Sequence, residues 1–327
     1  MNAAHCMRRS AASLVIGLAL ALCACRDEAI RLGNLKFAHY GAVSYVTELA
    51  PRCGIKVEEH VFAKGLDIMQ AMIAGELDVG ATAAEAAISG RAGGAPIYIV
   101  AGFARGGARL LARPDAGVRT LADLKGKRVG VTRGAIQELL LVAELAKVGL
   151  TYSERPGSDV LLVYLAYPDL NQALSAKTLD AIMQTEPQSS QAIAKGFGVE
   201  LLKPYDTPLG EPVRTLVMSK KFYETQRASA EKFMRCFVNA TQLFRDQPKV
   251  AEEYVRTRMF KSQLSSAEFT AALGNSPYGV DITPQHIQTT IDMMVQYGVG
   301  KLAKPPEATD FVRLELLSRA QGGLGAR

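Results

Sequence analysis

The segment AMIAGELDVGATAAEAA, residues 71–87, contains the unit that decides the fold. An amphipathic run stops at Gly75, a short apolar strand follows at Leu77 and Val79, and small residues then lead into an alanine-rich helix. The first N–H groups of a helix have no partner within the helix and carry the positive end of its dipole. The small side chains therefore indicate either a tightly packed turn or a helix start that is open to ligand oxygens.

A second segment, ALSAKTLDA at residues 173–181, repeats part of this unit. It aligns with AMIAGELDV at residues 71–79 and shares two Ala, a Leu and an Asp in register, 102 positions later. Two copies are too few for a solenoid or a propeller. The repeat predicts two related α/β units that face each other across a shared site, and a chance match between two strand starts is the alternative.

Length and composition limit the class of protein. The chain has 327 residues, which favours two domains, and 48% of them are hydrophobic, as in an ordinary globular α/β protein. The formal net charge is +6, and without residues 1–25 it is +4, from 36 Lys and Arg against 32 Asp and Glu. Because these charges are spread along the chain, we expect no nucleic-acid partner, whereas an anionic ligand is compatible with them.

The N-terminus has the layout of a secretory signal. Arg8 and Arg9 precede a short apolar stretch that ends in Leu-Cys-Ala-Cys at residues 22–25. Residues 22–25 resemble a bacterial lipobox, in which Cys25 becomes the first mature residue and carries lipid. We therefore expect residues 1–25 to be a signal peptide and the protein to lie in the periplasm on a lipid anchor. A leader that is cleaved after Ala24 without lipidation is the alternative.

The mature chain would then retain two cysteines, Cys53 and Cys236. An oxidising compartment permits them to pair, but nothing in the sequence places them close together, so we predict two partly buried free thiols. The chain has no CxxC motif, and its few histidines lack zinc-ligand spacing. We expect neither a metal nor a cofactor.

Strands and helices alternate over most of the chain. The expected strands span residues 35–37, 55–61, 77–79, 97–100, 109–113, 127–131, 159–164, 179–183, 199–202 and 213–218. Helices are expected at residues 43–52 and 135–148, and residues 219–317 are expected to be mainly helical. This alternation predicts largely parallel sheets that are covered on both faces.

Four motifs, in order, carry a resemblance to a known family. They are GELDVGATAAEAA, AGGAPIYIVAGF, TLADLKGKRVGV and TLDAIMQTEP, and they fall between about Leu35 and Arg214. The ordered set resembles the periplasmic substrate-binding proteins of ABC importers. Within these it is most similar to the nitrate, sulfonate, taurine and thiamine-pyrimidine group.

The resemblance implies an α/β chain with a type II periplasmic-binding-protein fold. Such a fold has two α/β lobes that are joined by two crossover strands, with a ligand cleft between the lobes. We place the crossovers near residues 110–113 and 213–217. Lobe 1 then comprises residues 30–112 plus 216–327, and lobe 2 comprises residues 113–215. The two repeated units fall in different lobes, and their helix starts would hold ligand oxygens.

The resemblance also implies a set of ligand-binding residues, which lie on loops after strands and at helix starts. They are Tyr40, Gly41, Thr82, Ala83, Phe103, Thr132, Arg133, Gly134, Ala135, Tyr167, Thr185 and Glu186. Ordinary alternatives apply: the tyrosines could pack in the core, Glu186 could support the hinge, and Arg133 could face solvent. Three further arginines are expected to form a solvated set: Arg105, Arg109 and Arg113.

The chain departs from the family pattern at several of these positions. Relatives carry Trp where this chain has Thr185, and Ser or Pro where it has Ala83, Ala84 and Ala135. A slot of Tyr, Phe and small residues suits an organic acid, an aromatic carboxylate or a pyrimidine as well as a sulfonate.

The expected function is capture of a small anionic or aromatic organic solute and its delivery to an ABC permease by a monomeric, non-catalytic protein. An enzyme on the same fold, similar to menaquinone-pathway enzymes or the yeast pyrimidine synthase, is one alternative. The chain has no P-loop and no GxSxG elbow, which disfavours an enzyme. His39 is expected to be a core or rim histidine. A sensory binding protein that presents its ligand to a membrane receptor is the other alternative.

Overall fold

The structure is a computed structural model that describes residues 28–322. Its first sheet has the strand order β2-β1-β3-β11-β4. The strands are β1 (Ile30–Leu35), β2 (Val57–Phe62), β3 (Val79–Ala83), β4 (Ile97–Arg105) and β11 (Val213–Ser219). Strands β1, β2 and β3 are parallel, and β11 runs antiparallel to both β3 and β4. The first lobe is built around this sheet.

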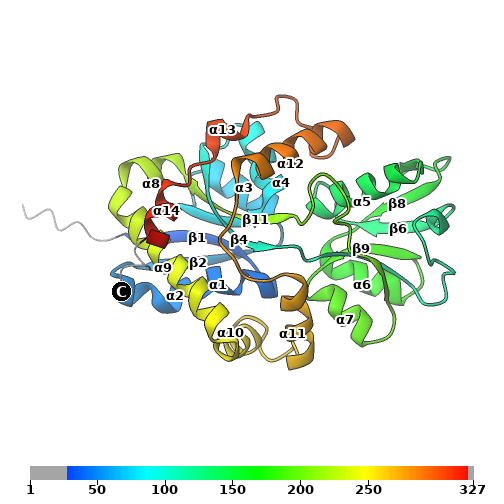
Figure 1. The fold of residues 1–327 in the computed structure, drawn as a ribbon, viewed down its shortest axis with the longest axis horizontal. Helices are drawn as coiled ribbons and strands as arrows, with labels where there is room; N and C mark the ends of the chain where they lie inside the picture. The colour runs from blue at the N-terminus through cyan, green and yellow to red at the C-terminus, as the bar shows by residue number, and fades with distance from the viewer. Residues whose placement is uncertain (1–27, 323–327) are drawn as a thin grey trace, which may run out of the picture.

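The second sheet has the strand order β10-β5-β9-β6-β8-β7 and forms the second lobe (Figure 1). Its strands are β5 (Ala108–Ala112), β6 (Arg128–Val131), β7 (Tyr152–Ser153), β8 (Val160–Tyr164), β9 (Ala181–Thr185) and β10 (Val199–Leu202). Four helical segments belong to this lobe: η3 (Ala122–Leu124), α5 (Ile136–Lys147), α6 (Tyr167–Ser175) and α7 (Gln188–Ala194).

The first lobe takes its helices from both parts of the chain. Those before β4 are η1 (Ala38–Tyr40), α1 (Gly41–Ser44), α2 (Val46–Leu49), η2 (Ala50–Cys53), α3 (Gly65–Ile73) and α4 (Ala84–Ala92). Those after β11 are α8 (Lys220–Thr225), α9 (Arg227–Asp246), α10 (Pro248–Tyr254), η4 (Val255–Met259), α11 (Ser266–Asn275), α12 (Pro284–Tyr297), α13 (Ala308–Phe311) and α14 (Glu315–Gly322). Among the described helices, none combines the length and apolar character needed to cross a membrane.

The repeated Leu-Asp unit occupies equivalent positions in the two sheets. Strand β3 lies between β1 and β11, and β9 lies between β6 and β5 in the same parallel and antiparallel sense. Asp78 Oδ2 accepts hydrogen bonds from Arg31 N at 2.9 Å and Nε at 3.0 Å. Asp180 Oδ2 accepts from Arg128 N at 2.9 Å and Nε at 3.3 Å. The side chain of each Asp therefore joins the start of its strand to the neighbouring parallel strand by hydrogen bonds.

The leucines of the repeat pack in matching ways as well. A Cβ added to Gly33 in β1 would lie 2.6 Å from Leu77 Cδ1, and one added to Gly130 in β6 would lie 2.4 Å from Leu179 Cδ1. Both contacts are too close for a real Cβ, so each leucine needs a glycine on the adjacent strand. The prediction of two related α/β units is confirmed, and the repeat has a structural cause.

The strand pairing corrects the expected lobe boundaries. Strand β5 pairs with β9 and β10, so residues 108–112 belong to the second sheet rather than to lobe 1. All of β11 pairs within the first sheet, so residues 213–215 belong there rather than to lobe 2. The first connection between the lobes therefore lies before β5, at Gly106 and Gly107.

These two glycines form the first connection between the lobes. Their φ angles are 67° and 81°, in the left-handed region that L side chains rarely adopt, and they follow the last residue of β4, Arg105. Gly106 N donates to Pro212 O at 2.9 Å, and Gly107 N donates to Asn275 O at 2.9 Å. Because Pro212 lies on the return connection from β10 to β11, the two crossings are hydrogen-bonded to each other.

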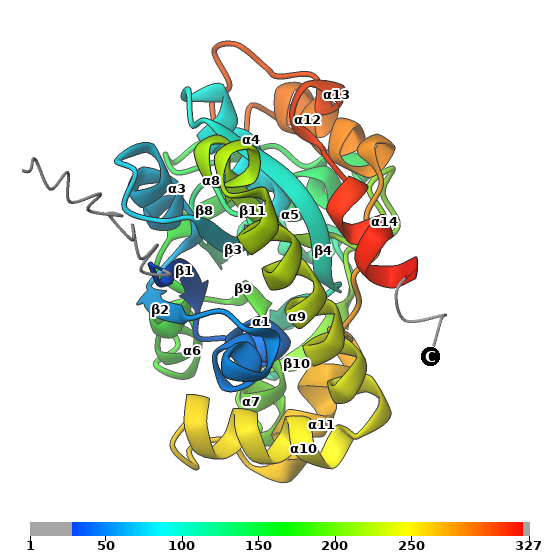
Figure 2. The same cartoon turned by 90° about the vertical axis from the view of Figure 1, so that its left-hand side faces the viewer.

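The prediction of two free thiols is wrong: Cys53 and Cys236 form a disulfide, with 5.9 Å between their Cα atoms. Cys53 ends η2, and Cys236 is fully buried in α9. Helix α9 runs along the first lobe beside α14 (Figure 2). The same helix contacts η2, the segment that ends in Cys53. The 183 residues that separate the cysteines hid this contact from the sequence.

Two expected elements near the N-terminus also differ. Strand β1 spans Ile30–Leu35 rather than residues 35–37. The single helix expected at residues 43–52 is a series of short helical pieces, and Pro51 lies in the last of them, η2. Proline has no N–H, which prevents a regular helix from continuing through this position. The predicted signal peptide and Cys25 lie outside the described residues.

Candidate functional site

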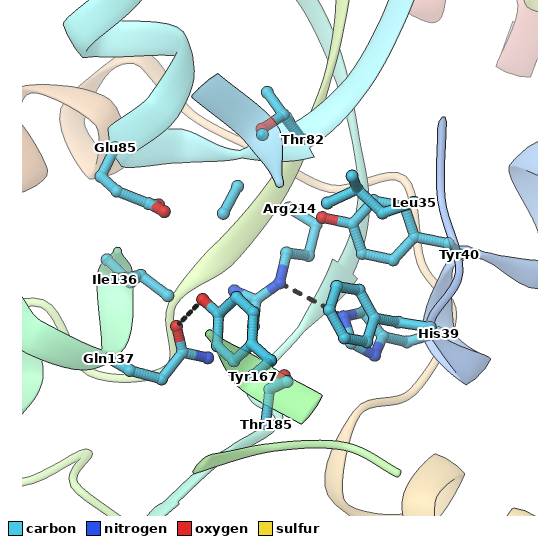
Figure 3. A pocket seen from close by; sticks show the side chains of 13 residues that line it. Leu35, His39, Tyr40, Thr82, Glu85, Ile136, Gln137, Tyr167, Thr185 and Arg214 are labelled. Carbon is cyan, nitrogen blue, oxygen red and sulfur yellow. Dashed lines mark hydrogen bonds between the residues drawn. The ribbon is translucent and has the colours of Figure 1, made fainter. Parts of the chain in front are cut away.

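A small cavity of about 30 Å³ lies between the two lobes and takes its walls from both (Figure 3). The first lobe contributes Phe37, His39, Tyr40, Thr82, Glu85 and Arg214. The second lobe contributes Ile136, Gln137, Tyr167 and Thr185. We call this space the inner cavity. It is large enough to hold water but far smaller than a site for a drug-sized molecule.

Arg214 projects into the inner cavity from the start of β11 in the first lobe. It lies on β11, whose seven residues are all buried, and only 2% of its surface is exposed. Its Nε donates to His39 Nε2 at 3.3 Å, and its Nη2 donates to Gly106 O at 3.2 Å (Figure 3). Its Nη1 has no hydrogen-bond partner among the described residues. The site therefore contains a buried guanidinium whose Nη1 can still donate hydrogen bonds to a ligand.

Glu85 faces the same space from the second residue of α4. It is 4% exposed, and its Oε2 has no hydrogen-bond partner within residues 28–322. Burial raises the pKa of Glu85 to about 7, against the lowering effects of Arg214 and of the backbone N–H groups of Glu85, Ile136 and Ala86. Because Ile136 begins α5, this carboxylate lies where the helix starts of the two lobes meet.

Two more polar atoms face the cavity without partners in the described chain, His39 Nδ1 and Thr82 Oγ1. Burial, with a smaller contribution from Arg214, holds the pKa of His39 well below its usual range. His39 is therefore neutral, and because Nε2 accepts from Arg214, we assign its proton to Nδ1. The imidazole thus offers a donor to the cavity, and the Thr82 hydroxyl offers both a donor and an acceptor.

Aromatic rings form the rest of the wall and connect the lobes. Phe37 and Tyr167 meet edge to face across the cleft, with ring centroids 5.5 Å apart. The Tyr167 hydroxyl donates to Gln137 Oε1 at 2.7 Å, which fixes the ring within the second lobe. Tyr40 packs against Phe103 at 4.6 Å between centroids.

A larger space, the outer chamber, lies on the other side of the Phe37–Tyr167 contact and has a volume of about 820 Å³. Both of these rings line the outer chamber as well as the inner cavity. Its basic side chains are Lys36, Lys64 and Arg133. The aromatic pair therefore separates the buried polar groups from a wide, positively charged entrance.

The predicted site residues divide between these spaces. Tyr40, Thr82, Ala83, Tyr167 and Thr185 all line the inner cavity. Thr132 and Arg133 line the outer chamber instead. The Arg133 guanidinium lies 3.6 Å from the centroid of the Tyr164 ring and forms an ion pair with Glu154.

Five predicted residues border neither space: Gly41, Phe103, Gly134, Ala135 and Glu186. A Cβ on Gly41 would lie 2.5 Å from Val255, in a separate apolar cluster of the first lobe. Phe103 lies behind Tyr40 and is fully buried. Gly134 donates its N–H to Glu138, and Ala135 is the residue before α5.

Glu186 has a structural contact instead of a place in the cavity wall. It is fully buried, and its Oε1 accepts from Arg109 Nη1 at 3.0 Å. Arg109 also pairs with Glu200, and its exposed fraction is only 9%. Arg113 donates to Asp180 at 3.1 Å. The expectation that Arg109 and Arg113 belong to a solvated set is wrong, because each is held by carboxylates.

The helix starts at the cleft are uncapped, as the small residues predicted. Neither Ala83 before α4 nor Ala135 before α5 makes a side-chain cap. The occupant of this region is Glu85, whose carboxylate interacts with backbone N–H groups of both helices. The helix starts are therefore already contacted by a carboxyl group of the chain itself.

Sequence reasoning missed the two charged residues of the inner cavity. The signal for Arg214 was a single charge within VRTLVMS, a strand that is otherwise apolar or small. The signal for Glu85 was the only acidic side chain in ATAAEAA. Within residues 28–322, no group of three or more His, Cys, Asp or Glu side chains could hold a metal ion.

Comparison with known proteins identifies the family. The sequence model of the NMT1-like family matches residues 26–258, which is more than half of the chain. The chain belongs to the NMT1-like family. One relative in sequence is a putative ABC transporter periplasmic binding protein of Brachyspira hyodysenteriae, 23% identical over 68% of this chain and 67% of the relative. Another is a putative aliphatic sulfonates-binding protein of Escherichia coli, 27% identical over 57% of each chain.

The fold of this NMT1-like chain is also that of solved binding proteins. The alkanesulfonate-binding protein of Xanthomonas axonopodis pv. citri, solved with bound MOPS, superimposes with a TM-score of 0.74. The superposition covers 87% of this chain and 98% of that protein, at 22% sequence identity. The predicted family and the predicted fold of two α/β lobes around a cleft are confirmed.

Proposed function

We propose that this chain is an extracytoplasmic solute-binding protein that captures a small organic solute between its lobes and delivers it to an ABC permease. The observation that carries the proposal is the inner cavity, whose walls come from both lobes and present four polar atoms without partners in the described chain. Buried polar groups without partners are rare in folded proteins because each costs about 1–3 kcal/mol. A solute that supplied the partners would favour the closed arrangement of the lobes.

The size of the inner cavity indicates how the solute would enter. Small-molecule sites measure roughly 300–1,000 Å³, which is at least about ten times the volume of the inner cavity. The lobes must therefore move apart to admit a solute, and the paired connections at Gly106 and Pro212 are the place where such a hinge would act. The outer chamber would be the path of entry.

A ligand screen by thermal unfolding tests this function. The oxidised chain without residues 1–25 is heated with alkanesulfonates, aminosulfonates, nitrate, aromatic carboxylates, amino acids and hydroxymethylpyrimidines. A ligand at 100 times its Kd should stabilise the fold by about 2.7 kcal/mol. Thr82→Val should abolish the shift, whereas Thr309→Val at an exposed position of α13 should retain it. Absence of any stabilising solute, or a shift that Thr82→Val leaves intact, would contradict a solute site at this cavity.

The location and the anchor are part of the proposal. The Cys53–Cys236 disulfide supports a compartment outside the cytoplasm, because disulfides persist in oxidising surroundings. We propose that Cys25 carries lipid and holds a monomer at the periplasmic face of a membrane. Labelling of the full chain with a radioactive fatty acid should succeed for the native sequence and fail for Cys25→Ser. Equal labelling of both would show that Cys25 is not the acylated residue.

An enzyme on this fold and a sensory binding protein are the other candidates, and only the enzyme has a residue to argue for it. His39 is buried and neutral within the site. However, its Nε2 accepts from Arg214, which leaves no free ring nitrogen to act as a general base. Turnover of a bound solute, followed by mass spectrometry, would favour an enzyme. Purification with a receptor instead of a permease would favour a sensor.

A further inference from the structure

The inner cavity holds a basic and an acidic side chain that make no direct ion pair with each other. Arg214 Nη1 and Glu85 Oε2 both line this space, and neither has a hydrogen-bond partner among the described residues. Opposite charges in a protein interior normally form a direct pair, because isolated buried charges are costly. Here the two side chains point toward a common space from β11 and α4 (Figure 3).

Each side chain is held in place by its remaining contacts. Two of the three nitrogens of the Arg214 guanidinium are engaged, Nε by His39 and Nη2 by the carbonyl of Gly106. Glu85 interacts with backbone N–H groups of α4 and α5. These contacts keep the guanidinium and the carboxylate apart, so the cavity offers a fixed donor at one place and a fixed acceptor at another.

We infer that the cleft selects zwitterionic solutes, in which an anionic group meets Arg214 and a protonated amine meets Glu85. The inference rests on the proposed function and deepens it by naming the class of solute. A carboxylate or sulfonate would accept from Nη1, as charge-assisted bonds to Arg commonly do. The amine would donate to Glu85 Oε2, and the short spacer between the two groups would pack against Phe37, Tyr40 and Tyr167.

Solutes with a single charge fit this arrangement less well. A simple anion would satisfy Arg214 but would leave Glu85 without a partner and face its negative charge. It would also compete with Glu85 for the helix starts of α4 and α5, which a simple anion would otherwise use. A simple cation would satisfy Glu85 but would leave Arg214 without a partner and face its positive charge. Discrimination of this kind comes from the buried group that the wrong solute leaves unpaired.

Matched pairs of solutes that differ only in the amine test this inference. Isothermal titration of the oxidised chain without residues 1–25 compares taurine with ethanesulfonate, β-alanine with propionate, and 4-(aminomethyl)benzoate with 4-methylbenzoate. We expect at least one zwitterion to bind at least about tenfold more tightly than its partner without the amine. Glu85→Gln should reduce that ratio to within about threefold by weakening the zwitterion. Glu253→Gln, at an exposed position of α10, should leave the ratio unchanged.

The comparison with the native chain does not depend on a variant that could fail to fold. Equal affinity for both members of every pair overturns the inference, and so does a Glu85→Gln variant that weakens both members equally. If simple anions bind and zwitterions do not, the inference fails while the proposed solute-binding function stands. If the native chain binds none of the six probes, the inference fails, and binding of any other solute in the thermal screen decides the proposed function separately.

Discussion

The raised pKa of Glu85 makes a prediction about stability as a function of pH. An unfolded chain would ionise this group near 4.5, whereas burial in the cleft raises its pKa to about 7. The folded state therefore binds the proton more tightly than the unfolded state does. The favourable contribution of the protonated group is complete below pH 4.5 and is lost as the pH rises to about 7. Between pH 5 and pH 8 this loss amounts to about 2–3 kcal/mol.

Glu85→Gln removes the ionisation but keeps the shape of the side chain. We expect the free energy of unfolding of this variant, minus that of the native chain, to increase by about 2–3 kcal/mol between pH 5 and pH 8. Denaturation in guanidinium chloride at several pH values, without ligand, measures the difference. His39 acts in the opposite direction, because its lowered pKa destabilises the fold as the pH falls below 6.5. Both proteins contain His39, so its contribution largely cancels.

An exposed glutamate provides the control. Glu253→Gln on α10 should give a difference in unfolding free energy that is nearly independent of pH. If the difference for Glu85→Gln changes by less than about 1 kcal/mol over this range, the reasoning is refuted. Glu85 would then be solvated in the native protein, and the lobes would spend most of their time apart.

Three further predictions concern the framework of the site. Cys53→Ser should lower the free energy of unfolding by about 2–5 kcal/mol under oxidising conditions, because a long loop is no longer closed in the unfolded chain. Gly106→Ala should cost roughly 1–3 kcal/mol, because φ is 67° and the added Cβ would lie 2.6 Å from Asn275 O. Arg109→Met should cost about 3–5 kcal/mol, because Glu186 would stay buried without its partner. Chemical denaturation measures all three.

Each of these predictions has its own control. A reducing agent should lower the stability of the native chain and leave Cys53→Ser unchanged; equal effects on both would argue against the disulfide. Gly117→Ala should cost less than Gly106→Ala, because Gly117 also has a positive φ but its Cβ would meet nothing within 4 Å. If both substitutions lower the free energy of unfolding equally, the cost of Gly106→Ala comes from backbone strain and not from the contact with Asn275. Recovery of stability in the double variant Arg109→Met, Glu186→Gln is expected, and its absence would mean that Arg109 acts mainly by packing.

The fold was predictable because its signals are local and occur twice. The Leu-Asp pairs at residues 77–78 and 179–180 mark strand starts whose partners, a glycine and an arginine, lie on the neighbouring strand. The positions at which the chain crosses between the lobes were harder to predict from the sequence. Residues 109–113 have the alternation of a strand in either sheet, and only the pairing of β5 with β9 assigns it to the second lobe.

The site was predicted in part, for a physical reason. Thr82 and Thr185 lie at the ends of strands and Tyr167 begins a helix, and such positions meet at the edges of sheets that face a cleft. Arg214 is the second residue of a strand, and its side chain reaches the cavity because β11 lies between β3 and β4. The disulfide depends on the placement of α9 against η2, which no local pattern encodes.

The disulfide between Cys53 and Cys236 has a consequence for how the chain tolerates cleavage. The covalent ring that it closes contains every strand and helix of the second lobe, from β5 to β10. A protease that cuts once in that lobe would leave the two fragments attached to each other through sulfur. Nicked protein would therefore migrate as a single species on a gel without reductant and as two fragments with it, and it could retain the complete first sheet after the cut.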